Sequence, residues 1–211
     1  MSEQVFSSLS QMVIDGDMES AVEEVKRVLG EGLSPQIVME GHLIPAMREV
    51  GRLFEENEYF VPELLISARA MQESMKILNP LLKSSGVDKI GRIAIGTVQG
   101  DFHDIGKNLV ASMLEGGGFE VIDLGVDVSA EKFVAEVKEN EKTVIAMSAL
   151  LTTTMPQMKK VIERLESEGL REKSRVMIGG APVTEEFAKL IGADGYSENA
   201  STAVTLAKSF F

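Results

Sequence analysis

The residues with the clearest chemical potential lie in the stretch Gly100–Asn108, which reads Gly-Asp-Phe-His-Asp-Ile-Gly-Lys-Asn. It contains His103, with Asp101 two residues before it and Gly106 three residues after it. A carboxylate so placed can accept a hydrogen bond from one ring N–H, fix the tautomer and leave the other nitrogen as a metal ligand. An isolated Asp-x-His pair also fits a loop histidine that caps a helix, so both interpretations stay open at this point.

A metal site built from protein side chains alone is not predicted. The chain has no cysteine, and His42 is its only other histidine. A zinc or iron cage would need a set of carboxylates that the sequence does not assemble. One histidine suffices where the metal already sits inside a macrocycle, and Gly106 would let a bulky group approach the backbone. We interpret His42 as a packing or helix-surface residue.

The elements that must position His103 follow from hydrophobic periodicity. After about residue 84, short β-branched runs alternate with amphipathic stretches. The predicted strands are Arg92–Val98, Glu120–Leu124, Thr143–Ala149, Arg175–Ile178 and Gly195–Tyr196. The predicted helices are Ile105–Glu115, Ala130–Asn140, Met155–Glu168, Glu185–Leu190 and Ala200–Phe210. Five such units predict an open, doubly wound, flavodoxin-like or Rossmann-like parallel sheet, whose ligands bind beyond the carboxyl ends of the strands. His103 follows the first of these strands.

The first part of the chain has helical periodicity without a strand signal. Four helices are predicted, at about Glu3–Ile14, Met18–Leu29, Ser34–Phe54 and Pro62–Leu78. Pro45 should kink the third helix, and Pro80 should disturb the end of the fourth. Such short helices need one another to bury their apolar faces, so a four-helix bundle is expected. We place this domain at residues 1–86 and the α/β domain at 87–211, with a linker around Ser84–Gly91.

Composition bounds the possible partners. The 211 residues are 44% hydrophobic, enough for a core, and carry a formal net charge of −12. A strongly anionic surface repels nucleic acid and anionic lipid, so neither is an expected partner. The start of the chain has no signal-peptide pattern, and the longest apolar-rich run, Val144–Leu151, is too short to span a bilayer. A cytoplasmic location is therefore expected.

The Gly100–Asn108 stretch resembles the Asp-x-His-x-x-Gly signature of cobalamin-binding modules. Ser148-Ala149-Leu150 after the third strand and Gly179-Gly180 after the fourth are similar to later parts of that signature. The helical first part resembles the cap domain of methionine synthase and of the corrinoid proteins of methyltransferase systems. The resemblance covers nearly the whole chain and implies a helical cap followed by a cobalamin-binding α/β domain.

The resemblance also implies residue roles. His103 would replace the dimethylbenzimidazole of the cofactor as the lower cobalt ligand, with Asp101 bonded to its ring. Thr154 stands where methionine synthase has a serine hydroxyl. The nucleotide tail would enter a slot lined by Ser148, Leu150, Thr152, Gly179 and Gly180, where the glycines leave room for it. The remaining cofactor-binding positions are Glu40, Phe54, Val61, Gly100, Phe102, Asp104, Ile105, Gly106 and Ala200. Phe54 and Val61 would cover the upper face of the cobalt; the alternative for both is ordinary bundle core.

The function that the resemblance implies is that of a methyl carrier. Bound to cobalamin, as methylcobalamin or a related corrinoid, the protein would take a methyl group from a substrate-specific methyltransferase and deliver it to a tetrahydrofolate or thiol methyltransferase. A reductive activating protein is a further expected partner. The carrier would have no catalytic residue of its own. The alternatives are a mutase subunit, a cobalamin-dependent sensor and a non-corrinoid binding module. The chain contains neither a substrate barrel nor a DNA-binding segment, and it has no tryptophan.

Overall fold

The computed structural model describes residues 7–84, 89–140 and 142–211. The chain divides into two compact units, Met1–Lys89 with Glu115–Gly118, and Ile90–Leu114 with Phe119–Phe211. We call them the helical unit and the α/β unit. The domain boundary predicted between residues 86 and 87 lies outside the described residues. Within the described part, no helix combines the length and the hydrophobicity that a membrane crossing requires.

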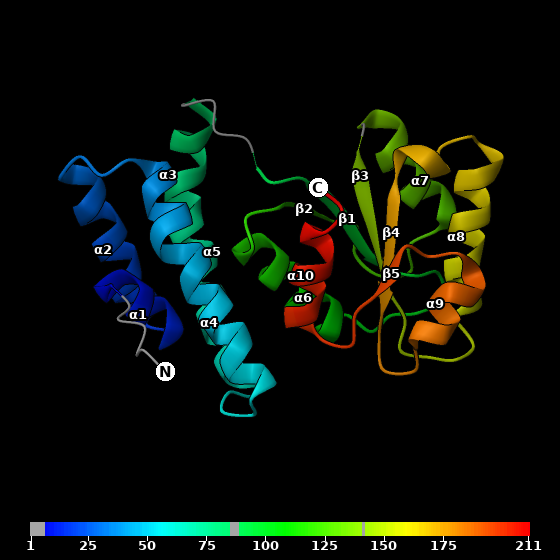
Figure 1. The fold of residues 1–211 in the computed structure, drawn as a ribbon, viewed down its shortest axis with the longest axis horizontal. Coiled ribbons are helices and arrows are strands. Elements are labelled where there is room, and N and C mark those ends of the chain that lie inside the picture. Colours follow the sequence, from blue (N-terminus) through cyan, green and yellow to red (C-terminus); the bar gives the residue numbers. More distant parts are fainter. Residues whose placement is uncertain (1–6, 85–88, 141) are drawn as a thin grey trace. The chain divides into compact units, whose positions relative to one another are not determined.

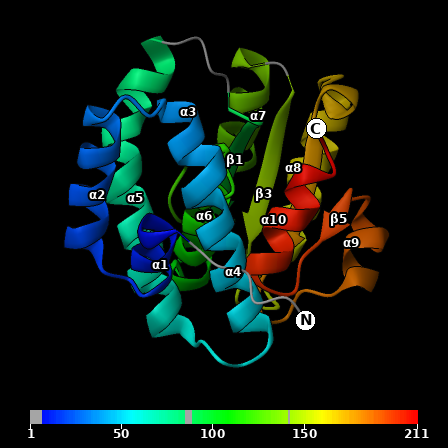
Figure 2. The ribbon, with the colours of Figure 1, turned by 60° about the vertical axis from the view of Figure 1, so that its left-hand side comes forward.

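The described part of the helical unit contains four helical segments, as the sequence predicts (Figures 1 and 2). They are α1 (Ser8–Ile14), α2 (Met18–Gly30), a continuous run made of α3 (Pro35–Val38), η1 (Met39–Leu43) and α4 (Ile44–Glu55), and α5 (Val61–Ser84). Side-chain oxygens of Ser7, Asp17 and Ser34 accept backbone N–H bonds at the starts of the first three segments. Their apolar faces meet in a core that includes Val13, Val25, Val38, Leu43, Val50, Leu64 and Met71, all buried.

The two prolines inside helices behave differently. The stretch η1 just before Pro45 is π-helical, with the Ile44 N–H bonded to the Met39 carbonyl. Pro45 has no N–H to continue the normal ladder, and a π turn is one way in which a helix accommodates such a loss. The predicted end near Leu78 is wrong, because α5 continues through Pro80 to Ser84. Leu78 and Leu82 are both buried, so packing maintains the helix across the one missing bond.

The α/β unit is built on five parallel strands. They are β1 (Arg92–Thr97), β2 (Glu120–Asp123), β3 (Thr143–Ser148), β4 (Arg175–Gly179) and β5 (Gly195–Tyr196). Their order in the sheet is β2-β1-β3-β4-β5, with Thr97 beside Ser148 at one end of the β1–β3 register. This is the flavodoxin-like order, and its topological switch point lies between β1 and β3. The predicted doubly wound parallel sheet is confirmed.

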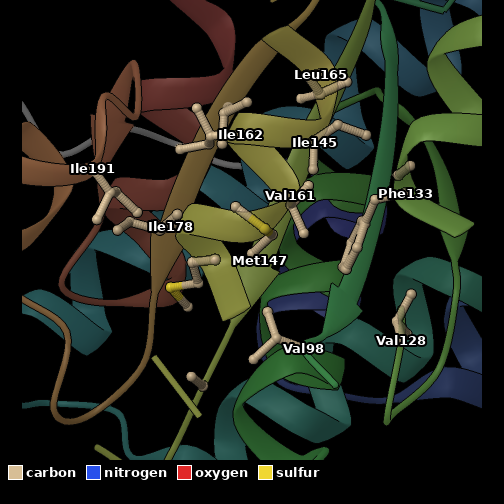
Figure 3. Close-up of a cluster of buried hydrophobic side chains, with 14 of the residues drawn as sticks. Val98, Val128, Phe133, Ile145, Met147, Val161, Ile162, Leu165, Ile178 and Ile191 are labelled. Atoms are coloured by element: carbon tan, nitrogen blue, oxygen red, sulfur yellow. The ribbon is translucent and has the colours of Figure 1, made fainter. Parts of the chain in front are cut away.

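Helices cover both faces of this sheet (Figure 1). They are α6 (Ile105–Gly116), α7 (Ala130–Glu139), α8 (Pro156–Ser167), α9 (Glu185–Ile191) and α10 (Ala200–Lys208), with a short 3-10 turn at Arg171–Lys173. Helices α7, α8 and α9 pack on one face, where Phe133, Val161 and Ile162 lie against Ile145 and Ile178 (Figure 3). Helices α6 and α10 pack on the other. Strands buried on both sides read as continuous apolar runs, which explains why they were predictable.

Candidate functional site

The Asp-x-His loop lies at the topological switch point of the sheet. It follows β1, and the loop of Ala149–Met155 follows the adjacent strand β3. The Val98 N–H donates to the Ser148 carbonyl over 3.0 Å, which joins the two loops at their base. Parallel strands therefore deliver both loops to the same edge of the sheet, where ligands of this fold class bind.

Asp101 holds His103 in a defined orientation. The carboxylate Oδ1 lies 2.7 Å from the ring Nδ1 and accepts the backbone N–H of His103 over 3.1 Å. Asp101 is fully buried, whereas the His103 side chain is 52% exposed. An ionised carboxylate only accepts hydrogen bonds, so Nδ1 carries the proton of this contact. The site therefore leaves Nε2, on a half-exposed ring, as the ring nitrogen that faces away from Asp101.

The second carboxylate oxygen of Asp101 faces the loop after β3. Oδ2 accepts the N–H of Leu150 at 2.8 Å, the N–H of Leu151 at 3.2 Å and the hydroxyl of Thr154 at 2.8 Å. Burial by itself would raise the pKa of Asp101, but the bonds from the His103 ring, the Leu150 N–H and the Thr154 hydroxyl outweigh it and hold the pKa below its ordinary value. Asp101 therefore stays ionised, which is what the tautomer of His103 requires.

The loop after β2 supports the Asp-x-His loop from the other side. Asp127 accepts the Gly100 N–H over 2.7 Å and donates its own N–H to the Asp101 carbonyl over 3.0 Å. Gly100 has a φ of 81° and Asp127 a φ of 52°, both in the left-handed region. The Thr97 hydroxyl donates to the His103 carbonyl over 2.8 Å. The histidine backbone is thus fixed before any ligand binds.

An ion pair joins the buried Lys107 to the half-exposed Asp123. The Lys107 ammonium is 1% exposed and lies 2.6 Å from both carboxylate oxygens of Asp123 and 2.6 Å from Asn108 Oδ1. Asp123 Oδ1 also accepts the Gly125 N–H over 2.8 Å. The pair therefore ties the start of α6 to the loop after β2.

The two glycines at the end of β4, Gly179 and Gly180, are required by the protein itself. A Cβ on Gly180 would lie 2.0 Å from the Ala149 carbonyl oxygen, and the residue has a φ of 126°. A Cβ on Gly179 would lie 3.0 Å from the Ser197 carbonyl oxygen. The Ala149 N–H also donates to the Gly179 carbonyl over 3.3 Å. The space beside Gly180 is therefore filled by the β3 loop, so a leucine there would distort the backbone rather than simply occupy a slot.

Several of the predicted positions surround His103 with exposed apolar surface. Phe102 is 70% exposed and Ile105 is 73% exposed. Gly106 has open space on its Cβ side, with nothing within 4 Å. Leu150 and Thr152 are exposed in the β3 loop. Large apolar side chains exposed beside a histidine are typical of a binding surface.

Three further predicted positions lie at the ends of helices and strands of the α/β unit. Asp104 is the residue before α6, and its carbonyl accepts the Asn108 N–H. Ser148 is half-buried at the end of β3, and Ala200 is buried at the start of α10.

Three predicted positions and the second histidine belong to the helical unit. Glu40 is exposed in η1 and accepts a bond from Gln36. Phe54 is half-buried in the last turn of α4, and Val61 is 39% exposed at the start of α5. His42 has its Nδ1 2.8 Å from Ser7 Oγ.

Five contributors to the site were missed from the sequence. They are Thr97, Leu151 through its backbone N–H, Asp127, Lys107 and Asp123. Backbone donors leave no trace in residue type. Lys107, however, shares the helix face of the buried residues Ala111 and Leu114, and a lysine at such a spacing signals a paired buried charge.

The site fits a metal that arrives in its own macrocycle. Among the described residues, no group of three or more histidine, cysteine, aspartate or glutamate side chains could hold a metal ion. The single ligand offered is the Nε2 of His103, with an orienting carboxylate behind it and exposed apolar side chains beside it. This is the donor set that one axial position of a macrocyclic metal requires.

Comparison with known proteins also indicates a protein that binds a metal in a macrocycle. Two family models match, each described as a B12 binding domain, one over residues 91–205 and one over residues 5–79. Dimethylamine corrinoid protein 1 of Methanosarcina acetivorans is 45% identical over 98% of this chain and 97% of its own length. The trimethylamine corrinoid protein of Methanosarcina barkeri is 41% identical over 98% of this chain and 96% of its own.

A solved structure matches over the same extent. It is the methanol:cobalamin methyltransferase complex of Methanosarcina barkeri, which superposes with a TM-score of 0.85 at 30% identity, covering 98% of this chain and 81% of the matched chain.

Proposed function

The chain belongs to the B12-binding corrinoid proteins of methyltransferase systems and is a methyl-carrying corrinoid subunit; on that premise we propose that His103 is its axial cobalt ligand. The observation that carries this is the Asp101–His103 bond at the switch point, with Nε2 left on a half-exposed ring. A mutase subunit and a sensor are not favoured, since the relatives serve methyltransferase systems.

Each residue of the Asp-x-His loop has its own proposed role in holding the cofactor. His103 supplies the axial nitrogen, and Asp101 fixes the ring and its tautomer through the 2.7 Å contact. When bound, the corrinoid cobalt supplies the chemistry, accepting a methyl group from a donor and surrendering it to a nucleophile. Phe102 and Ile105 offer apolar surface to the macrocycle, while the open side of Gly106 admits its close approach.

We place the nucleotide tail against the β3 and β4 loops. Support comes from their contiguity, because Gly180 packs on Ala149 and the next residue, Leu150, bonds to Asp101. Ser148 and Gly179 are the last residues of β3 and β4, and Thr152 lies in the loop after β3. Because the Cβ position of Gly180 is filled by the Ala149 carbonyl, its first role is to let the two loops approach each other.

The helical unit would shield the reactive face. Phe54 and Val61 flank the α4–α5 connection with partly exposed apolar side chains, which suits a surface that excludes water. Glu40 and Ala200 are proposed as further contacts to the cofactor. Such a shield has to move aside before an enzyme can exchange the methyl group.

The partner of this subunit is a methyltransferase. We propose in addition an acceptor methyltransferase that uses tetrahydrofolate or a thiol, and a reductive activating protein. The relatives are named for dimethylamine and trimethylamine, and one matched structure is a methanol:cobalamin methyltransferase complex. Methylamine and methanol methyltransferases are therefore the donors to test first.

The test combines cofactor binding with methyl loading. The purified protein should retain cobalamin and acquire a methyl group from one of these donor enzymes. His103→Ala should change the absorption spectrum of the bound cofactor, whereas His42→Gln, which alters the other histidine, should not. An unchanged spectrum in His103→Ala, or a cofactor still ligated by its own base, would overturn the assignment.

A further inference from the structure

Asp101 is bonded to two different loops through its two oxygens. Oδ1 serves His103 alone, through the ring at 2.7 Å and the backbone N–H at 3.1 Å. Oδ2 serves the β3 loop alone, through Leu150 at 2.8 Å, Leu151 at 3.2 Å and Thr154 at 2.8 Å. The carboxylate is therefore the point at which the loop of the axial ligand and the loop after β3 are joined.

The β3 loop depends on this carboxylate because burial does not hold it. Leu150 and Leu151 are 43% and 42% exposed, and Thr152 and Thr153 are exposed as well. Between buried Ala149 and buried Thr154, the path of the chain is therefore defined by the bonds to Asp101 together with the turn bonds that the Leu151 carbonyl accepts from Thr154 and Met155. An alanine has no acceptor oxygen, so in its place neither His103 nor the β3 loop would keep this partner.

We propose that Asp101 is a positioning residue for the nucleotide tail as well as for His103, because its Oδ2 holds the β3 loop in the conformation that receives the tail. This rests on the proposed function, in which Leu150 and Thr152 line the tail slot. The competing view is that Asp101 acts through His103 alone. The two views differ in which ligands, and which backbone amides, respond when Asp101 is changed.

The ligand test compares cobalamin with cobinamide, which has the corrin ring and cobalt but lacks the nucleotide tail. The ratio of their dissociation constants isolates the contribution of the tail. His103→Ala should weaken both ligands and leave the ratio near the wild-type value. Asp101→Ala should in addition reduce the preference for cobalamin by roughly tenfold, the effect of losing about one hydrogen bond that orders the loop. A wild-type ratio in Asp101→Ala would overturn the proposal.

Amide hydrogen exchange in the cofactor-free protein provides a test that needs no ligand. Asp101→Ala should accelerate exchange at Leu150 and Leu151 by roughly tenfold or more, while His103→Ala should leave both amides at the wild-type rate. Failure of the wild type to bind either corrinoid would refute the proposed function, yet the exchange rates would still decide whether Asp101 orders the loop.

If Asp101→Ala does not fold, the wild-type protein alone provides a test. The amides of Leu150 and Leu151 should then exchange at least tenfold more slowly than those of Thr152 and Thr153, for which the described residues supply no hydrogen-bond acceptor. Equal, fast exchange at all of these amides would overturn the proposal.

Discussion

Replacing Gly180 by alanine should destabilise the cofactor-free protein strongly. The φ of 126° lies where only glycine is comfortable, and such a conformation costs an L-residue about 1–3 kcal/mol. The added Cβ would also lie 2.0 Å from the Ala149 carbonyl oxygen and 3.0 Å from its carbonyl carbon. Both atoms belong to backbone, so the β3 loop would have to shift, at a further cost of about 1–3 kcal/mol.

These contributions sum to about 2–6 kcal/mol, a large part of the stability of an ordinary domain. For a chain of this length they correspond to a fall in melting temperature on the order of 10 °C. Circular dichroism during thermal unfolding of the cofactor-free variant measures it directly.

Gly106→Ala is the matched control. Nothing lies within 4 Å of its added Cβ, and the residue is in the first turn of α6. Alanine there should leave the stability unchanged or raise it by about 0.5–1 kcal/mol. The same methyl group should weaken cobalamin retention, because it occupies the side from which the macrocycle approaches. An unchanged melting temperature in Gly180→Ala would refute the close packing of the β3 and β4 loops.

Three further changes test other parts of the structure. Asp123→Ala should lower the free energy of unfolding by about 2–3 kcal/mol, because it leaves the buried Lys107 ammonium without its counter-charge. A second change, Lys107→Met, should restore most of that stability. A double variant no more stable than Asp123→Ala would contradict the pairing. Phe54→Ala, at a half-buried position, should lower the free energy of unfolding by about 1–2 kcal/mol and speed oxidation of the cobalt(I) form. A loss of about 3–5 kcal/mol with an unchanged oxidation rate would instead assign Phe54 to the bundle core. The hydrogen bond from Arg27 lowers the pKa of Glu24 from 4.5 to about 2. This ion pair should therefore add roughly 0.5 kcal/mol to the free energy of unfolding above pH 4.5, and the contribution, which Glu24→Gln removes, should fade as the pH falls toward 2. Urea midpoints of the wild type and Glu24→Gln that differ equally at both ends of this pH range would exclude the contribution.

Much of the fold was predictable because local pattern and tertiary role coincide. Strands buried on both faces read as continuous apolar runs, and Ser34-Pro35 is a strong helix start, which the structure confirms. The end of α5 was mispredicted because packing of Leu78 and Leu82 overrides the local effect of Pro80.

The site was predictable only in part. Asp101 and His103 stand out by residue type and spacing, and the structure brings them within 2.7 Å. The N–H groups of Leu150 and Leu151 contribute through the backbone, which any residue could supply, so the sequence does not mark them. Glycine at 180 was expected to leave room for a ligand, but the conflict with Ala149 arises from chain segments distant in sequence. Such contacts follow from loop geometry rather than from composition.

The most direct test of the central claim identifies the nitrogen bound to cobalt. The protein is prepared with all histidines labelled with nitrogen-15, loaded with unlabelled cobalamin and reduced to the cobalt(II) state for electron paramagnetic resonance. Because His42 is the only other histidine, the measurement is repeated on His42→Gln. If His103 is the axial ligand, the nitrogen splitting changes from a triplet to a doublet in both proteins. A triplet that persists after labelling would mean that the cofactor keeps its own base on cobalt and that His103 is not its ligand.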